Sequence, residues 1–165
     1  MFHGALVTAT GTEVNMIGLL QRVTHAQVAV DGSIIATIGR GALVLVGVEL
    51  GDGMRQADRL LERLLGYRVF PDAEGRMNLS LRDVEGELLL VPQFTLAADT
   101  SKGARPSFSS AAPPDAGKSL FEQLVAGAEA RYPRVTCGRF GADMKVTLTN
   151  DGPVTFWLRT PPDAG

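Results

Sequence analysis

The residues whose types and spacing could do chemistry lie in a long irregular segment after Leu96. The first half of this segment carries Asp99, Thr100, Ser101, Lys102 and Arg105, which are one acidic, two hydroxyl and two basic side chains. A long stretch without secondary structure inside a compact domain is usually either functional or disordered. The segment is therefore a candidate part of a site, with a solvated surface loop as the alternative.

Arg22 is a second candidate because of the strand face on which it lies. In a strand from Met16 to Val23, its side chain shares a face with Gly18 and Leu20, where an apolar residue is expected. One interpretation is that the side chain snorkels to solvent at the strand end. The other is that Arg22 is buried and donates its N–H groups to carbonyl oxygens of a nearby loop.

The third candidate is the sequence NDGPVTFW, from Asn150 to Trp157. Asparagine, aspartate and glycine tolerate positive φ, so they predict a hairpin turn between the flanking strands KVTLT and VTFWL. Pro153 has no N–H to donate and belongs at the edge or start of a strand. The sequence therefore predicts a hairpin whose tip holds Gly152 and Pro153.

The catalytic motifs of the common hydrolases are missing from this sequence. There is no G-x-S-x-G stretch, and no serine or cysteine has an obvious histidine base, since the histidines are His3 and His25. Carboxylates are scattered singly, and the glycines of segment 39–47 lack the Walker lysine and the dinucleotide spacing. Neither histidine has a cysteine or acidic cluster beside it, so no metal and no cofactor is expected. Any reaction must depend on positioned backbone groups or on the substrate itself.

The composition is that of one globular domain. The chain has 165 residues, 45% of them hydrophobic, and a formal net charge of −2, so no bulk basic surface indicates nucleic acid. The single cysteine, Cys137, excludes an internal disulfide and favours a reducing, cytoplasmic location. No apolar run approaches the ~20 residues that span a bilayer. Residues 1–15 lack the features of a signal peptide and are expected to be a poorly ordered extension, followed by a domain at 16–160 and a tail at 161–165.

Apolar periodicity predicts two helices among about eight strands. The first helix has an apolar stripe of Met54, Ala57, Leu60, Leu61, Leu64 and Leu65, and the second has one of Leu120, Phe121, Leu124, Val125 and Ala128. Asp52 is the expected N-cap of the first helix. The strands are expected at 16–23, 26–30, 34–38, 42–48, 86–96, 134–140, 144–150 and 153–159. The prediction is an α+β fold, with two helices outside a strongly curved, barrel-like and mostly antiparallel sheet.

Five long segments of this chain carry a family resemblance. They are LLQRVTHAQVAVDG, GYRVFPDAEGRMNLS, VPQFTLAADTSKGARPSF, GRFGADMKV and NDGPVTFWL. Together, and in this order, they resemble the bacterial D-aminoacyl-tRNA deacylases from Met16 to about Arg159. The family's two signature motifs are matched by Gln93–Leu96 and Asn150–Thr155. One departure is Pro92, which stands where the first motif commonly begins with serine.

The resemblance implies the deacylase fold and an enzyme that hydrolyses the ester between a D-amino acid, or glycine, and the 3′-terminal adenosine of tRNA. It implies a homodimer without metal, in which a Gly-Pro loop with a cis peptide reaches into the partner's site. Gly152 and Pro153 would then direct backbone carbonyls at the substrate, and the Cβ of an L-residue would collide with the loop. Such an enzyme performs chiral proofreading in translation.

The resemblance also assigns roles to the other candidates. Arg22 would anchor the loop of Gly152 and Pro153 through hydrogen bonds. Gln93, Phe94 and Thr95 would lie beside the scissile ester, with a backbone N–H of Phe94 or Thr95 as the oxyanion hole.

Lys102 and Arg105 would contact phosphates of the tRNA end. Phe140 is a candidate for the adenine pocket, with a plain core aromatic as the alternative. The nucleophile is either the Thr95 hydroxyl or a water activated by the ribose 2′-hydroxyl of the substrate. The second is favoured, since no general base lies near Thr95 in the sequence.

Two other functions stay open on the sequence alone. The fold is shared in outline with a domain of a bacterial septum-placement inhibitor, so a chain that had lost activity could be a non-catalytic interaction module. Pro92 also keeps open an esterase that acts on another acyl adduct. Both signature motifs are intact, which favours the deacylase.

Overall fold

The computed structural model of the chain describes residues 16–160. The predicted extension at 1–15 and tail at 161–165 lie outside the described residues. In chain order the elements are β1 (Ile17–Val30), β2 (Ser33–Ile38), β3 (Gly41–Gly47), α1 (Met54–Gly66), β4 (Phe70–Pro71), β5 (Met77–Leu79), β6 (Glu87–Pro92), the 3-10 helix η1 (Phe94–Ala97), α2 (Pro114–Arg131), β7 (Val135–Cys137) and β8 (Met144–Arg159). In this range no helix is long and apolar enough to cross a membrane.

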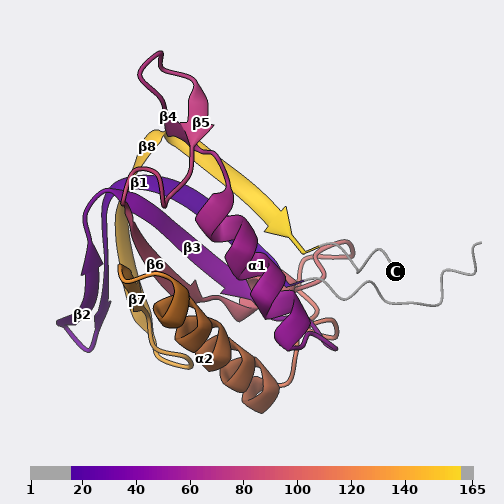
Figure 1. Cartoon of the computed structure of the whole chain (residues 1–165). Helices are drawn as coiled ribbons and strands as arrows, with labels where there is room; N and C mark the ends of the chain where they lie inside the picture. Colours follow the sequence, from indigo (N-terminus) through magenta and orange to yellow (C-terminus); the bar gives the residue numbers. More distant parts are fainter. Residues whose placement is uncertain (1–15, 161–165) are drawn as a thin grey trace, which may run out of the picture.

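One six-stranded sheet forms the body of the molecule, with strand order β2-β1-β3-β6-β7 and β8 paired to β1. β1 is antiparallel to β2, β3 and β8, whereas β3, β6 and β7 run parallel to one another. The sheet curves until β2 lies against β6 and β7, and both α-helices cover one outer face (Figure 1). The predicted curved, mostly antiparallel sheet with two external helices is confirmed, but the parallel strands were not foreseen.

Two apolar clusters fill the space on either side of the sheet. Successive side chains of β3 lie on opposite faces of the sheet. Val44 packs under the helices, and Leu43 faces the inside of the curved sheet. The predicted helical stripes supply the helix side of the first cluster, except that Met54 is exposed. Amphipathic helices are stabilised by this burial more than by their own propensity.

The expected N-cap of α1 was one residue early. Gly53 is the N-cap residue, and its N–H donates to the side chain of Gln56 at 2.9 Å. The Asp52 carboxylate instead accepts the N–H of Glu49 at 2.7 Å and closes the turn between β3 and the helix. A capping residue and a turn residue use the same acceptor chemistry, so the sequence does not separate them.

The strands depart from the prediction in several places, and the short strands β4 and β5 were not predicted. The two strands expected at 16–23 and 26–30 form one continuous β1, and the strand expected to run to Leu96 ends at Pro92, where η1 follows. The strand expected at 134–140 is reduced to β7.

The predicted hairpin at Asn150 is wrong. Both flanks belong to β8 and pair with the same neighbour: Asn150 is opposite Val23, and Thr155 is opposite Gln21. Segment 151–154 therefore stands opposite the single residue Arg22, as a bulge within one strand. A bulge and a hairpin tip use the same turn residues, and pairing of both flanks with β1 decides between them.

Candidate functional site

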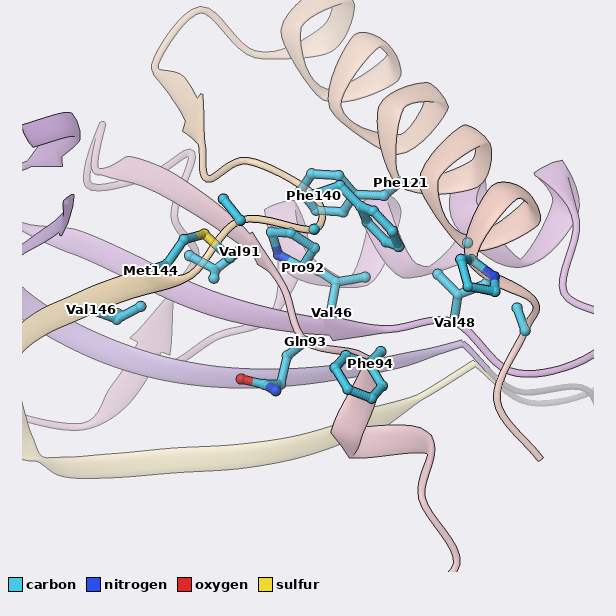
Figure 2. A pocket seen from close by; sticks show the side chains of 15 residues that line it. Val46, Val48, Val91, Pro92, Gln93, Phe94, Phe121, Phe140, Met144 and Val146 are labelled. Atoms are coloured by element: carbon cyan, nitrogen blue, oxygen red, sulfur yellow. The ribbon is translucent and has the colours of Figure 1, made fainter. Parts of the chain in front are cut away.

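A cavity of about 490 Å³ opens where β3 and β6 end, beside the start of α2. Among residues 16–160 no charged side chain lines it; the lining residues are Val46, Val48, Val91, Pro92, Gln93, Phe94, Ala112, Pro114, Gly117, Phe121, Phe140, Gly141, Ala142, Met144 and Val146 (Figure 2). The carboxyl ends of parallel strands are a common place for ligand sites. A concave apolar cavity with a few polar groups at its rim suits an organic ligand with a flat apolar part.

The segment Gln93-Phe94-Thr95 forms one rim of this cavity. The Gln93 N–H donates to the oxygen of Val46 at 2.8 Å, which fixes the segment to the end of β3. The side chain of Gln93 points away from Phe140 (Figure 2) and donates to the Thr95 hydroxyl at 2.5 Å. The first hydrogen bond of η1 runs from Leu96 N–H to Gln93 O, so the N–H groups of Phe94 and Thr95 precede it and can serve a ligand.

Pro92 stands just inside this rim. It is buried, lines the cavity and lies opposite Val46 as the last residue of β6. A Cβ on Gly138 would lie 3.4 Å from Pro92 Cδ and 2.8 Å from Met144 Sδ, so the chain after β7 packs tightly on this ring. Pro92 thus acts as a wall of the cavity, where the related motif has a hydroxyl.

Phe140 lies on the opposite wall of the cavity. Its ring is 6.5 Å from that of Phe121, centroid to centroid, with an interplanar angle of 41°. The ring covers Gly117 of α2, where a Cβ would lie 3.5 Å from Phe140 Cζ, an ordinary contact distance. The ring is half-buried, so one side remains for a ligand.

Arg22 is buried, with 9% of its surface exposed, and so the snorkelling interpretation is wrong. Its Nε donates to the main-chain oxygen of Asp151 at 2.9 Å, and its Nη1 donates to the oxygen of Val69 at 2.6 Å. The Asp151 carboxylate lies further from Nε, at 3.6 Å. The carbonyl oxygens of a loop are therefore the acceptors, as the second interpretation predicted.

The bulge itself is shaped by Gly152 and Asn150. Gly152 has φ +144°, and a Cβ there would lie 2.6 Å from Val154 Cγ2, so only glycine fits. The Asn150 side chain closes the base of the bulge: it accepts the Val154 N–H at 2.6 Å and donates to the Thr155 hydroxyl at 3.0 Å. The Gly152-Pro153 peptide is cis, as the resemblance implied.

The structure brings some of the predicted site residues together and leaves others apart. Gln93, Phe94 and Phe140 share the cavity, and Thr95 is hydrogen-bonded beside it. Gly152 and Pro153 are exposed and are not among the described residues that line it. Lys102 and Arg105 are exposed on the segment that joins η1 to α2.

Sequence reasoning missed two contributors to these sites. Asn150 was considered as a turn and motif residue without a role for its side chain, although its side-chain amide braces the bulge. Gly117 was not considered, because a glycine within a helix gives no sign of the aromatic ring that covers it. Within residues 16–160, no three histidine, cysteine or acidic side chains cluster as a metal site would require.

Comparison with known proteins identifies the family. Residues 19–159 match the family model described as D-Tyr-tRNA(Tyr) deacylase. The chain is 69% identical over 147 residues to the D-aminoacyl-tRNA deacylase of Nitrosococcus oceani, covering 89% of this chain and 95% of that protein. It is 62% identical over 148 residues to the D-aminoacyl-tRNA deacylase of Methylococcus capsulatus, covering 90% of this chain and 97% of that protein.

Two solved structures share the fold. The structure of a c-Myc DNA unwinding element binding protein superposes with a TM-score of 0.84 at 36% identity, covering 88% of this chain and 99% of that one. A second, named as a probable eukaryotic D-amino acid tRNA deacylase, has a TM-score of 0.76 at 19% identity, with 88% and 100% covered. From the family match, the relatives and the two signature motifs in place, the chain belongs to the D-Tyr-tRNA(Tyr) deacylase family.

Proposed function

We propose that the protein hydrolyses the ester of D-aminoacyl-tRNA to free tRNA and the D-amino acid, and so proofreads amino-acid chirality in the cytoplasm. The observation that carries the proposal is the Gln93–Leu96 motif at the rim of an uncharged cavity, in a chain whose family and relatives bear this activity in their names. Water supplies a hydroxyl to the carbonyl carbon, the bond to ribose O3′ breaks, and O3′ takes the proton.

The chemistry rests on backbone donors and on the substrate. We assign stabilisation of the oxyanion on the ester carbonyl to the N–H groups of Phe94 and Thr95; they precede the first hydrogen bond of η1, which supports this role. The Thr95 hydroxyl accepts from Gln93, and neither residue is a base that could remove its proton. The ribose 2′-hydroxyl of the substrate therefore orients and activates the attacking water.

The adenine of the terminal adenosine is assigned to the apolar cavity beside Phe140. An uncharged cavity with one free aromatic face suits a purine base, which stacks well and carries no charge. Lys102 and Arg105 then take phosphates of the preceding nucleotides. A few basic side chains near one cavity are enough for a chain with a net charge of −2 to bind an RNA end.

Chiral selection is assigned to the bulge of β8 acting across a two-fold homodimer. Gly152 and Pro153 are exposed and do not line the described cavity of their own chain, so they are free to enter the site of a partner. Arg22 and Asn150 hold the bulge in place, and a fixed backbone excludes an L-side chain by collision. Glycine has no Cβ, so glycyl-tRNA is expected to be a substrate as well.

Hydrolysis of matched substrates tests the proposal. D-Tyr-tRNA and Gly-tRNA should be deacylated and L-Tyr-tRNA should survive, with no loss of activity in EDTA because the described residues hold no ligand cluster. Absence of any deacylation by a folded protein would favour the non-catalytic interaction module. Rapid cleavage of an unrelated acyl ester with D-Tyr-tRNA untouched would favour the other esterase.

A further inference from the structure

Two aromatic rings lie exposed beside the cavity and are not explained by the reaction. Phe94 is 59% exposed and Phe108 is 43% exposed, and their ring centroids are 5.2 Å apart at an interplanar angle of 48°. Large apolar side chains are normally buried, and an exposed cluster of them marks a contact surface. Phe94 lines the cavity (Figure 2), and its contact with Phe108 extends this apolar surface beyond the lining residues.

Main-chain and side-chain hydrogen bonds hold Phe108 in this place. On one side, Asp99 and Ser107 exchange two backbone hydrogen bonds, at 2.7 and 2.9 Å. On the other side, the Ser110 hydroxyl donates to Ala97 O at 2.9 Å, and Ser110 O accepts the Leu50 N–H at 2.9 Å. The ring is thus positioned before any ligand arrives, which lowers the entropy cost of binding.

The same segment carries positive charge a few residues before Phe108 in the sequence. Lys102 and Arg105 lie in the tip that the Asp99–Ser107 pair closes, and no ion pair within residues 16–160 involves either of them. The Asp99 carboxylate accepts two hydrogen bonds from Ser101, at 2.9 and 2.6 Å. Its charge is therefore directed into the loop, and the two basic side chains remain for an external anion.

We propose that Phe94 and Phe108 form a stacking platform for the base of the unpaired nucleotide that precedes the terminal adenosine, with Lys102 and Arg105 on its phosphates. Aromatic rings interleaved with basic side chains are the usual means of binding single-stranded nucleic acid. This inference rests on the proposed function, because it requires the terminal adenosine in the cavity. It adds a second nucleotide to the substrate that the protein recognises.

The platform can be tested by RNA binding alone, by combining removal of the base from the RNA with substitution of Phe108 in the protein. The probes are two 5′-fluorescent single-stranded RNA oligonucleotides ending in CCA, one intact and one with an abasic ribose before the terminal adenosine. Fluorescence anisotropy of the full chain should show that removing this base weakens binding by at least about fivefold. In Phe108→Ala and Phe108→Leu the same removal should change the affinity by less than about twofold, because the ring is one half of the coupled pair.

Matched controls sit on the ribbon of β4 and β5, away from the cavity. Met77→Ala removes another exposed apolar side chain and Arg76→Ala another exposed basic one, and both should keep the full effect of the missing base. Lys102→Ala with Arg105→Ala should weaken both oligonucleotides equally and reduce the salt dependence of binding.

Three results would overturn the platform. They are an equal loss of affinity in wild type and Phe108→Ala when the base is removed, no effect of the base in wild type, and no measurable binding of the intact oligonucleotide. Deacylation of D-Tyr-tRNA without this coupling rejects the platform and keeps the proposed function. If the effect of the missing base depends on the Phe108 ring but D-Tyr-tRNA is not deacylated, the proposed function is rejected and the RNA platform is kept.

Discussion

Arg22 Nε donates a hydrogen bond to the main-chain oxygen of Asp151 at 2.9 Å, and this contact joins β1 to the bulge of β8. The acceptor is a backbone atom, so the position of the bulge depends on the guanidinium and not on the identity of the side chain at 151. A second hydrogen bond to Val69 O ties the same guanidinium to the segment after α1. One buried side chain thus connects three segments that are distant in sequence.

Replacing Arg22 by lysine should lower both stability and activity. Lysine keeps the charge, but all its N–H donors lie on one nitrogen, so it does not reproduce the two separate donor atoms Nε and Nη1 of the guanidinium. Loss of one charged, buried hydrogen bond costs about 1.5–3 kcal/mol, and the melting temperature should fall by several degrees. Asp151→Asn is the control, because the carbonyl acceptor remains. Equal effects of the two substitutions, by thermal melting and by D-Tyr-tRNA hydrolysis, would contradict the anchoring role.

Replacing Gly152 by alanine should reshape the bulge. The new Cβ would lie 2.6 Å from Val154 Cγ2 and 3.3 Å from Arg22 Nη2, and the φ of +144° is unfavourable for alanine. D-Tyr-tRNA hydrolysis should fall at least about tenfold, the rate effect of 1.4 kcal/mol in the barrier. Gly32→Ala is the control, since it has φ +79° with nothing within 4 Å. An active Gly152→Ala enzyme that still rejects L-Tyr-tRNA would argue against selection by the bulge.

Replacing Thr95 by alanine should leave a substantial part of the rate. Its hydroxyl accepts one hydrogen bond from Gln93, so its loss removes one positioning contact, worth about tenfold in rate or less. D-aminoacyl-tRNA ending in 2′-deoxyadenosine should be cleaved very slowly by the wild type. Complete inactivity of a folded Thr95→Ala protein that still binds substrate would make Thr95 the nucleophile instead.

Replacing Asp52 by asparagine should stabilise the protein above neutral pH. Burial raises the pKa of the Asp52 carboxyl to about 6, with the charge of Glu49 adding to the effect, and its Oδ1 has no partner in the described chain. A raised pKa means that this group stabilises the fold below pH ~4, and that this stability is lost as pH rises through ~6. Asparagine keeps an acceptor for the Glu49 N–H and carries no charge at any pH.

The expected increase in the free energy of unfolding is modest, because the Asp52 side chain is only half-buried. Solvent therefore screens part of the cost of burying its charge. We expect about 1 kcal/mol at pH 8, seen as a higher melting temperature that converges with the wild type near pH 4. Asp58→Asn in the adjoining helix α1 is the control, because its carboxylate forms an exposed ion pair with Arg131 at 3.1 Å. A gain that did not change with pH would refute the role of the carboxyl charge.

The sequence by itself determined the helices and the family. The period of the apolar residues from Ala57 to Leu65 places one face of α1 against the sheet, because residues three or four apart lie on the same face of a helix. Alternation along β1 placed Arg22 on the buried face, which is a property of any strand. Five segments in order, two of them with intact signature motifs, carried the resemblance. All of these signals are local in the chain.

Tertiary structure decided whether the turn residues form a hairpin or a bulge, and which distant residues come into contact. Asn150 to Gly152 carry the same turn signal in a hairpin and in a bulge, and only the pairing of both flanks with β1 selected the bulge. Likewise, Phe94 and Phe108 are separated by an irregular segment, and hydrogen bonds to Ala97 and Leu50 bring their rings together. Register and ring contacts are long-range properties, because they depend on partners whose positions the local sequence does not encode.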